Sequence, residues 1–275
     1  MPDTATLLCV HPHPDDESIA CGGLLARSAT AGIRTVVVTC TDGEEGENLG
    51  GIDLGGRDLT DVRRDELDAA IRILGVDVHH RLGYRDSGMV GTPGNEHPDC
   101  FHRADTEAAA LRLAAIVRAE RPEAVVSDDV RGTYGHPDHI KAHAVTVRAV
   151  ALAADPEAPL DGAPWRVARR AVHTISHGRI RAAGAALAAA GQPSPFEERP
   201  DGFGTPDDAV TTRVEVADHV ATKLAAMRAH ASQMSPDSFF LNLADLAAAF
   251  FAVEEFVIEE GERVPGDDRD LVVGR

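Results

Sequence analysis

Cysteines, aromatic residues and long apolar runs are all scarce in this chain of 275 residues. Its four cysteines, Cys9, Cys21, Cys40 and Cys100, include no Cys-x-x-Cys pair, so neither a disulfide framework nor a zinc–cysteine site is expected. Cys9 and Cys40 fall in predicted core strands, where cysteine packs as a small hydrophobic residue. Cys21 lies close to a polar motif and could line a pocket, but packing is the simpler interpretation.

Membrane and secretion signals are absent from the sequence as well. No apolar stretch is long enough to span a bilayer, and the opening residues MPDTA carry no basic charge, so we expect a cytoplasmic protein. Positive charge is in short supply, because 27 Lys and Arg face 45 Asp and Glu, for a formal net charge of −18. With only one Trp and two Tyr and no basic stripe, this balance argues against nucleic acids and anionic membranes as partners.

Strand and helix patterns alternate through the first part of the chain, up to residue 155. Four apolar runs predict buried strands, at residues 5–11, 34–41, 78–82 and 124–127. Apolar periodicity with suitable ends predicts the intervening helices, at residues 18–31, 60–74 and 105–120, with a fourth that runs through residue 153. This rhythm predicts an α/β fold with a Rossmann-like, mostly parallel sheet and helices on both faces.

The pattern weakens after residue 155. A linker at 156–164 is followed by predicted strands at 171–176 and 209–216, and by helices at 179–190, 217–233 and near 241–256, with a Pro/Gly-rich loop at 191–208. We therefore expect a metal-binding catalytic domain at residues 1–155. A smaller C-terminal α+β portion, residues 156–275, would complete its substrate pocket as a cap. The long polar stretch 42–59 is expected to overhang the site.

Two polar motifs directly follow predicted strands. The octet HPHPDDES occupies residues 11–18, and the segment YGHPDH occupies residues 134–139. Imidazoles and adjacent carboxylates are costly to crowd at one strand end unless a cation binds them. Because open α/β sheets bind their ligands at the carboxyl ends of strands, the two motifs predict one divalent metal site.

The spacing of the motifs suggests how the work is divided. His13 and Asp16 can both aim at one ion from a strand-to-helix turn, and His139 is the natural third ligand, which leaves one position for water. Asp15 then faces the attacking water as a general base. His11, at the strand end, is more naturally a support for the ligands than a ligand.

The second motif has residues to spare for catalysis. His136 could protonate a leaving amine, and Tyr134 could donate a hydrogen bond to the oxyanion of a tetrahedral intermediate. Asp138 could orient the imidazole of His136 or that of a ligand. His143 follows His139 by one helical turn, and its role is left open. This inventory suits amide hydrolysis.

At these motifs the chain resembles the LmbE-like, or PIG-L, family of zinc-dependent N-acetylglucosaminyl deacetylases. The resemblance covers most of the chain and is strongest at residues 10–18, 39–44, 85–89 and 135–139. It implies one Zn²⁺ per chain, although Fe²⁺ or another divalent ion suits the same ligands. It also implies the roles already described, with His13, Asp16 and His139 as ligands, Asp15 as base, Tyr134 as oxyanion donor and His136 as acid.

Within that family the chain is most similar to the mycothiol-pathway enzymes. One branch deacetylates GlcNAc-inositol, and its sister branch hydrolyses the amide of mycothiol S-conjugates. The resemblance implies a small amino-sugar substrate, and an oligomer is compatible with it. The residues that match substrate-binding positions are Glu47, Arg63, Asp86, Met89 and His230.

The two branches leave mixed marks on the sequence. Met89 resembles the deacetylases, and Ala20 stands where the amidases tend to carry Lys, whereas residues 195–197, 210–215 and 235–246 resemble the amidases. We favour the GlcNAc-inositol deacetylase over the S-conjugate amidase and over a sugar deacetylase of a secondary-metabolite pathway. Two further alternatives are an amidohydrolase-type barrel, for which the β/α rhythm fades too early, and a non-catalytic sugar-binding or regulatory protein that keeps the site as scaffold.

Overall fold

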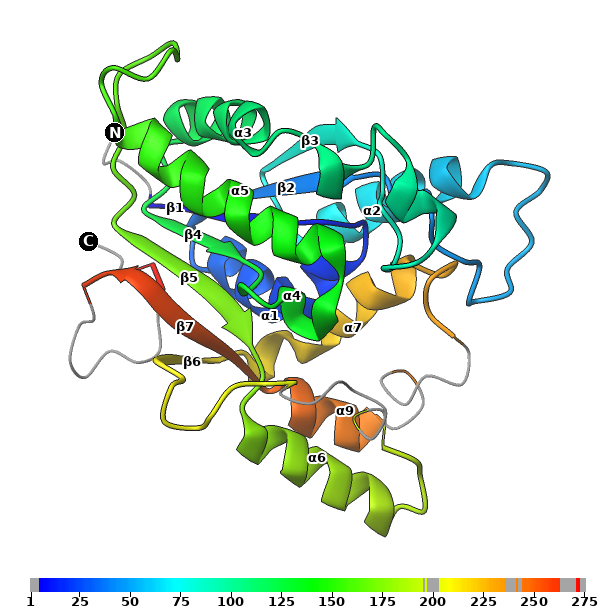
Figure 1. The fold of residues 1–275 in the computed structure, drawn as a ribbon. Helices are drawn as coiled ribbons and strands as arrows, with labels where there is room; N and C mark the ends of the chain where they lie inside the picture. Colours follow the sequence, from blue (N-terminus) through cyan, green and yellow to red (C-terminus); the bar gives the residue numbers. More distant parts are fainter. Residues whose placement is uncertain are drawn as a thin grey trace.

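The fold is known from a computed structural model, which describes residues 5–194, 196, 203–235, 241, 244–262 and 271–272. Within these residues a seven-stranded sheet is covered by helices on both faces (Figure 1). Its strand order is β3-β2-β1-β4-β5-β7-β6. Five strands are parallel, namely β1 (Thr6–His11), β2 (Arg34–Thr41), β3 (Val78–Tyr84), β4 (Ala124–Ser127) and β5 (Arg169–Thr174). The predicted mostly parallel α/β sheet is confirmed.

The helices form a layer on each face of the sheet. On one face lie α1 (Asp16–Thr30), α2 (Leu59–Leu74) and α7 (Val220–Ala229), which contact one another. On the other face α3 (Thr106–Glu120) packs against α5 (Pro137–Ala154). Successive side chains of a strand point to opposite faces, so Leu7 and Cys9 join one apolar cluster and Leu8 and Val10 join the other.

The strands and α-helices from β1 to β4, taken in chain order, begin and end within two residues of their predicted bounds, and so does the end of α5. Strong local signals mark these elements. The Asp58 side chain accepts a hydrogen bond from the backbone N–H of Thr60 at the start of α2, and Gly75 ends that helix with φ of 73°. The Asp105 carboxylate caps α3 in the same way, through the N–H of Ala108. Short helices that the sequence did not predict are α4 (Gly132–Gly135), η1 (Pro93–Glu96) and η2 (Phe101–Arg103).

The last third of the chain differs more from expectation. β6 (Thr212–Glu215) and β7 (Val253–Gly261) are antiparallel and extend the same sheet beyond β5. The predicted helix at 241–256 is wrong in its second half, since α9 (Ala244–Phe251) ends before β7 begins. The β-branched and aromatic side chains of this stretch favour a strand, and hydrogen bonding to β5 and β6 on its two sides decides the matter.

Other boundaries in this third are corrected more modestly. The helix expected at 217–233 is a short turn, η3 (Ala217–His219), followed by α7, and it ends at Ala229. The helix expected at 179–190 is α6 (His177–Ala189), which packs against α9 (Figure 1). Residues 195 and 197–202 of the expected loop, and residues 236–240 and 242–243 of the amidase-like stretch 235–246, lie outside the described residues. A domain division at residue 155 stays a prediction.

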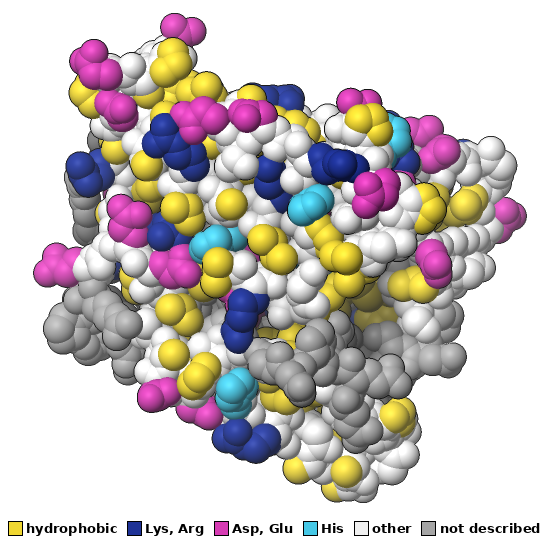
Figure 2. Space-filling view, in the orientation of Figure 1, with side chains coloured by type: hydrophobic (Ala, Val, Ile, Leu, Met, Phe, Trp, Pro, Cys, Tyr) yellow, Lys and Arg dark blue, Asp and Glu magenta, His cyan; other side chains and the backbone are white. Residues whose placement is uncertain are grey.

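Two properties of the surface and helices bear on partners. Among the described residues, no helix combines the length and apolarity needed to cross a bilayer. On the face shown in Figure 2, Lys and Arg side chains are scattered among Asp and Glu side chains rather than gathered into one patch.

The carboxyl ends of β1 and β4 lie side by side near the middle of the sheet, where the strand order changes direction, and this is the usual ligand position in such sheets.

Candidate metal centre and active site

The turn between β1 and α1 carries three of the predicted site residues. The backbone N–H of His13 donates to the Asp16 carboxylate over 2.9 Å, which closes the turn. Asp15 has φ of 119°, a conformation that L-residues rarely adopt, so the surrounding structure must hold it. Its N–H donates to Glu17 Oε2 over 3.0 Å, and its carboxylate lies 3.6 Å from Nη2 of Arg63.

The three predicted ligands lie together at this turn. His13 Nδ1 is 3.4 Å from Asp16 Oδ2, and His139 Nε2 is 3.6 Å from the same oxygen. Two ligands that each lie about 2.1 Å from one ion at a tetrahedral angle are roughly 3.4 Å apart, so the spacing suits a divalent cation. His139 Nε2 is buried and has no hydrogen-bond partner among the described residues, as expected of a nitrogen that a cation completes.

Carboxylates hold the other nitrogen of each imidazole. His139 Nδ1 lies 2.6 Å from Asp128 Oδ1. His13 Nε2 lies 3.3 Å from Asp138 Oδ2 and 3.4 Å from Asp86 Oδ1. A proton held at the far nitrogen leaves the near nitrogen with its lone pair free, and this is the tautomer that a metal ligand needs. The hydrogen-bond network therefore assigns both rings the ligand tautomer.

His136 and Tyr134 stand close to the ligands. The rings of His13 and His136 are 4.6 Å apart between centroids, and those of Tyr134 and His139 are 5.2 Å apart. The ligand atoms of His13, His136 and His139 lie within 4.8 Å of one another, so three imidazoles and a carboxylate gather around this position. His136 Nδ1 accepts the N–H of Asp138 over 3.1 Å and so caps α5, which leaves Nε2 to carry the ring proton.

Burial and neighbouring charges separate the pKa values of the three predicted catalytic groups. Burial raises the pKa of Asp15 to about 6, in spite of the nearby Arg63 guanidinium. Burial and the neighbouring His13 lower the pKa of His136 to about 4. Burial also raises the pKa of Tyr134, so its hydroxyl keeps its proton. Near pH 7 the site thus offers an ionised carboxylate, a neutral imidazole and a protonated phenol.

Of the two roles expected for Asp138, its position favours the second. Its side chain is fully buried, and Oδ2 faces His13 Nε2 rather than the ring of His136. The same carboxylate accepts hydrogen bonds from the backbone N–H of Ser87, over 2.8 Å, and from the Ser87 hydroxyl. Asp138 is therefore fixed from one side by Ser87 while it orients a predicted ligand on the other.

Asp128 is a residue of the site that sequence reasoning missed. Its Oδ1 lies 2.6 Å from His139 Nδ1 and 2.9 Å from His173 Nε2, and it accepts the Thr133 hydroxyl over 3.0 Å. His143, whose role was open, lies outside the ligand group and bonds through Nδ1 to the backbone oxygen of Asp128 over 2.9 Å. A signal was available, because Asp128 is an acidic residue directly after a predicted strand.

The predicted substrate-binding residues divide into exposed and buried members. Glu47 is exposed, and Met89 is 43% exposed. Arg63 is buried, and its guanidinium donates to the backbone oxygens of Gly43 over 2.8 Å and of Pro14 over 2.7 Å. Arg63 thus ties the loop after β2 to the turn that carries Asp15.

Asp86 and His230 are also buried. Asp86 accepts the N–H of Gly88 over 2.8 Å, and its other contacts include His13 Nε2. His230 has no exposed surface, and its Nε2 lies 2.7 Å from Oε1 of Glu17, the residue that also binds the N–H of Asp15. A direct contact between either residue and a substrate stays a prediction.

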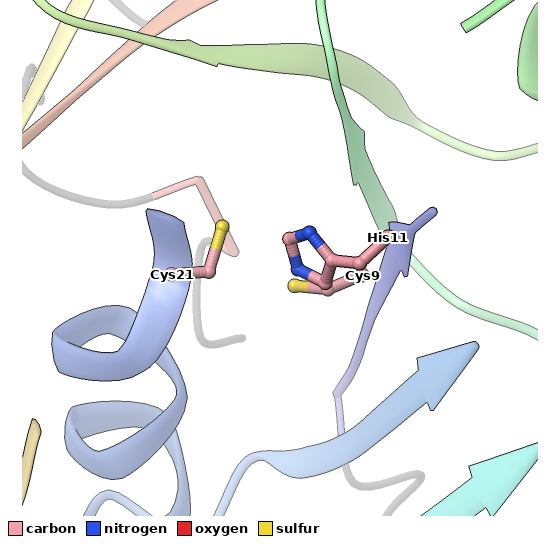
Figure 3. Close-up of side chains that lie close together, drawn as sticks. All are labelled: Cys9, His11 and Cys21. Carbon is pink, nitrogen blue, oxygen red and sulfur yellow. The ribbon is translucent and has the colours of Figure 1, made fainter. Parts of the chain in front are cut away.

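His11 does not support the predicted ligands through a hydrogen bond. It is fully buried, and neither of its ring nitrogens has a hydrogen-bond partner among the described residues. Its ring lies beside Cys9 and Cys21 (Figure 3).

A His/Asp cluster at the carboxyl edge of a parallel sheet is typical of metal-dependent hydrolases. The family model described as "PIG-L: GlcNAc-PI de-N-acetylase" matches residues 8–150, more than half of the chain. A "1D-myo-inositol 2-acetamido-2-deoxy-alpha-D-glucopyranoside deacetylase" from Thermomonospora curvata is 43% identical over 275 aligned residues, which cover 94% of this chain and 92% of the relative. The chain belongs to the PIG-L family of de-N-acetylases, and the resemblance seen in the sequence is confirmed.

Solved structures share the fold of this chain. The conserved protein TT1542 from Thermus thermophilus has a TM-score of 0.61 and 27% identity, with 94% of this chain and 97% of that chain covered. An N,N'-diacetylchitobiose deacetylase from Pyrococcus horikoshii has a TM-score of 0.64, 24% identity and coverage of 97% and 89%. The second likeness shows a shared fold.

Proposed function

We propose that this chain removes the acetyl group from 1D-myo-inositol 2-acetamido-2-deoxy-α-D-glucopyranoside, the GlcNAc-inositol of mycothiol biosynthesis. The observation that carries the proposal is the ligand cluster beside Asp15, in which carboxylates hold the far nitrogens of His13 and His139 while the near nitrogens meet Asp16. Relatives at 41–43% identity that bear the name of this substrate support the choice.

We propose one Zn²⁺ as the bound cation, held by His13, Asp16 and His139. Imidazole nitrogen and carboxylate oxygen are ligands that Zn²⁺ favours, and Fe²⁺ or another divalent ion accepts them too. When bound, such a cation polarises the amide carbonyl and lowers the pKa of a water molecule to about 7.

The protein side chains then divide the hydrolysis between them. Asp15 accepts a proton from the attacking water as the new C–O bond forms at the acetamide carbon. Tyr134 donates a hydrogen bond to the oxyanion of the tetrahedral intermediate. The C–N bond breaks as a proton reaches the amine nitrogen from His136, and the products are acetate and the free amino sugar. The proton that Asp15 takes from the water balances the one delivered to the amine nitrogen, so the protein ends the reaction with its protons unchanged.

The substrate-binding residues act at two depths in this proposal. Glu47 and Met89, which are exposed, contact the sugar directly. The other three set the position of the reacting groups from beneath: Arg63 through the Asp15 turn, Asp86 through the ring of His13, and His230 through Glu17. The exposed pair should therefore govern KM, whereas the buried three should govern kcat.

A side-by-side turnover assay of the metal-loaded enzyme tests the substrate. GlcNAc-inositol, a mycothiol S-conjugate and simple GlcNAc are compared by release of the free amine. We expect the highest kcat/KM with GlcNAc-inositol. Faster hydrolysis of the S-conjugate would establish the amidase alternative, which residues 210–215 resemble, and the absence of turnover with all three would overturn the proposal.

A further inference from the structure

A second group of potential metal ligands lies in the core, next to the catalytic cluster along the chain but separate from it. Cys9 and His11 are two residues apart on β1, so their side chains point to the same face of the sheet, towards α1. Cys21 points back at them from α1 (Figure 3). One nitrogen of His11 and the two sulfur atoms all lie within 4.8 Å of one another, and all three residues are fully buried.

The imidazole of His11 marks this group as more than ordinary packing. Both of its ring nitrogens are buried and make no hydrogen bond of ordinary geometry among the described residues; the Cys9 thiol, a weak hydrogen-bonding group, is the side chain that interacts with the ring. Interior polar groups nearly always find a good partner, because the water they lose must be replaced, so an imidazole with so weak a partner at full burial needs an explanation. A cation that binds His11 together with the two sulfur atoms supplies that missing partner.

We propose that Cys9, His11 and Cys21 form a second metal site, distinct from the catalytic cluster, for a thiophilic divalent cation of the Zn²⁺ and Cd²⁺ class. Thiolate ligands select such cations over Mg²⁺ or Ca²⁺. Two thiolates neutralise the two charges of the cation, and a complex without net charge is the form that an apolar interior tolerates best.

The surroundings of the three residues fit an enclosed site with three protein ligands. Cys9 and Cys21 belong to the buried apolar cluster that also contains Leu25, Val216 and Phe256. Because none of the three ligands is exposed, the cation enters as the chain folds and stays enclosed afterwards. Once bound, it ties β1 to α1, the two elements that flank the turn with His13 and Asp16, and it stabilises the folded chain by binding that state alone.

Cobalt(II) distinguishes this site from the catalytic one. Charge transfer from thiolate to Co²⁺ absorbs in the near ultraviolet, and only a site with cysteine ligands shows it. The protein is produced in cobalt-supplemented medium under reducing conditions, so that the cation is present during folding. We expect the wild-type protein to hold about two Co²⁺ per chain and to show the thiolate band.

Variants locate the band. Cys9→Ala and Cys21→Ala should each hold about one Co²⁺ per chain and lose the band, because each variant keeps only two of the three ligands of this site, too few to hold the cation. Cys100→Ser is the matched control: Cys100 is also fully buried but lies outside the cluster, so this variant should keep both the band and the stoichiometry. Thiol titration of the denatured wild-type protein verifies that its four cysteines are reduced.

Three results would overturn the proposal. One is a cobalt-loaded wild-type protein without a thiolate band, and this result is decisive even where a variant fails to fold. Another is a band that survives in the double variant Cys9→Ala/Cys21→Ala. The third is a disulfide between Cys9 and Cys21 in protein prepared under reducing conditions.

Discussion

His11 and His13 stand two residues apart, but their imidazoles lie in opposite chemical surroundings. The ring of His13 faces three carboxylates, at distances of 3.3–3.4 Å, at the carboxyl edge of the sheet. The ring of His11 faces two cysteines inside the apolar core. The difference arises because β1 ends at His11, so the chain has left the sheet before it reaches His13. The end of β1 therefore contributes to two groups of potential metal ligands, one of imidazoles and carboxylates and one of an imidazole and two thiols.

Loss of a ligand on the His13 side should have the largest effect. His13→Ala removes one of three protein ligands, so we expect the catalytic cation to be lost and amide hydrolysis to fall to background, a larger loss than the roughly 10²–10⁴-fold that a general base contributes. Metal analysis and turnover measure it. Chelation of the wild-type enzyme should mimic the variant, and added Zn²⁺ should restore only the wild type. A His13→Ala enzyme that keeps metal and activity would remove His13 from the ligand set.

Substitution of the base should separate chemistry from metal binding. Asp15→Asn keeps the size of the side chain, and Asn tolerates the positive φ at this position. We expect kcat to fall about 10²–10⁴-fold. Metal content should be unchanged, because Asp15 is not a proposed ligand. Steady-state kinetics and metal analysis on the same sample test this, and undiminished turnover would rule out the proposed mechanism.

Removal of the charge behind His139 should have a smaller effect. Asp128→Asn leaves the far nitrogen of His139 with a neutral partner, so we expect metal affinity or activity to fall about 10–100-fold. Titration with Zn²⁺ against a competing chelator measures the affinity. The exposed Asp161→Asn is the charge-matched control and should change neither quantity. Equal behaviour of the two variants would mean that Asp128 does not act on the metal centre.

The smallest effect is expected for a substitution beside His11, measured on protein from which metal has been removed. Cys21→Ala deletes one buried sulfur atom, so the free energy of unfolding in the presence of a chelator should fall by about 1 kcal/mol. Urea unfolding measures it, with Cys100→Ser as reference. If the free energy of unfolding falls by several kcal/mol in the presence of a chelator, the two thiols stabilise the core without a cation. The two clusters would then differ in packing rather than in metal binding.

The sheet could be predicted well where its strands are short, continuous apolar runs between clear helix caps. Such runs mark β2 and β4, whose bounds agree with the prediction. β7 could not be recognised in this way. Its residues follow an Ala-rich helix without a break in composition, and two of its four Glu residues, Glu254 and Glu255, are buried against basic partners. Only the pairing with β5 and β6 makes this segment a strand.

The site was predictable to the extent that its residues follow strand ends. His13, Asp16 and His139 could be grouped from the sequence because β1 and β4 are neighbours whose carboxyl ends meet. Asp128 had the same signal but no motif around it. His173 could not be foreseen, because it reaches Asp128 from β5, a strand whose place beside β4 is a property of the whole sheet.

By itself, the sequence determined the family, the parallel half of the sheet and the residues gathered at its carboxyl edge, because local periodicity and short motifs encode these features. The tertiary structure alone decided which nitrogen of each imidazole faces the cation position and which carboxylate holds the other one. It alone also brought Cys21 to Cys9 and His11. Those arrangements depend on how α1 packs on β1 and how distant strands pair, and contacts between remote segments leave no period in the chain.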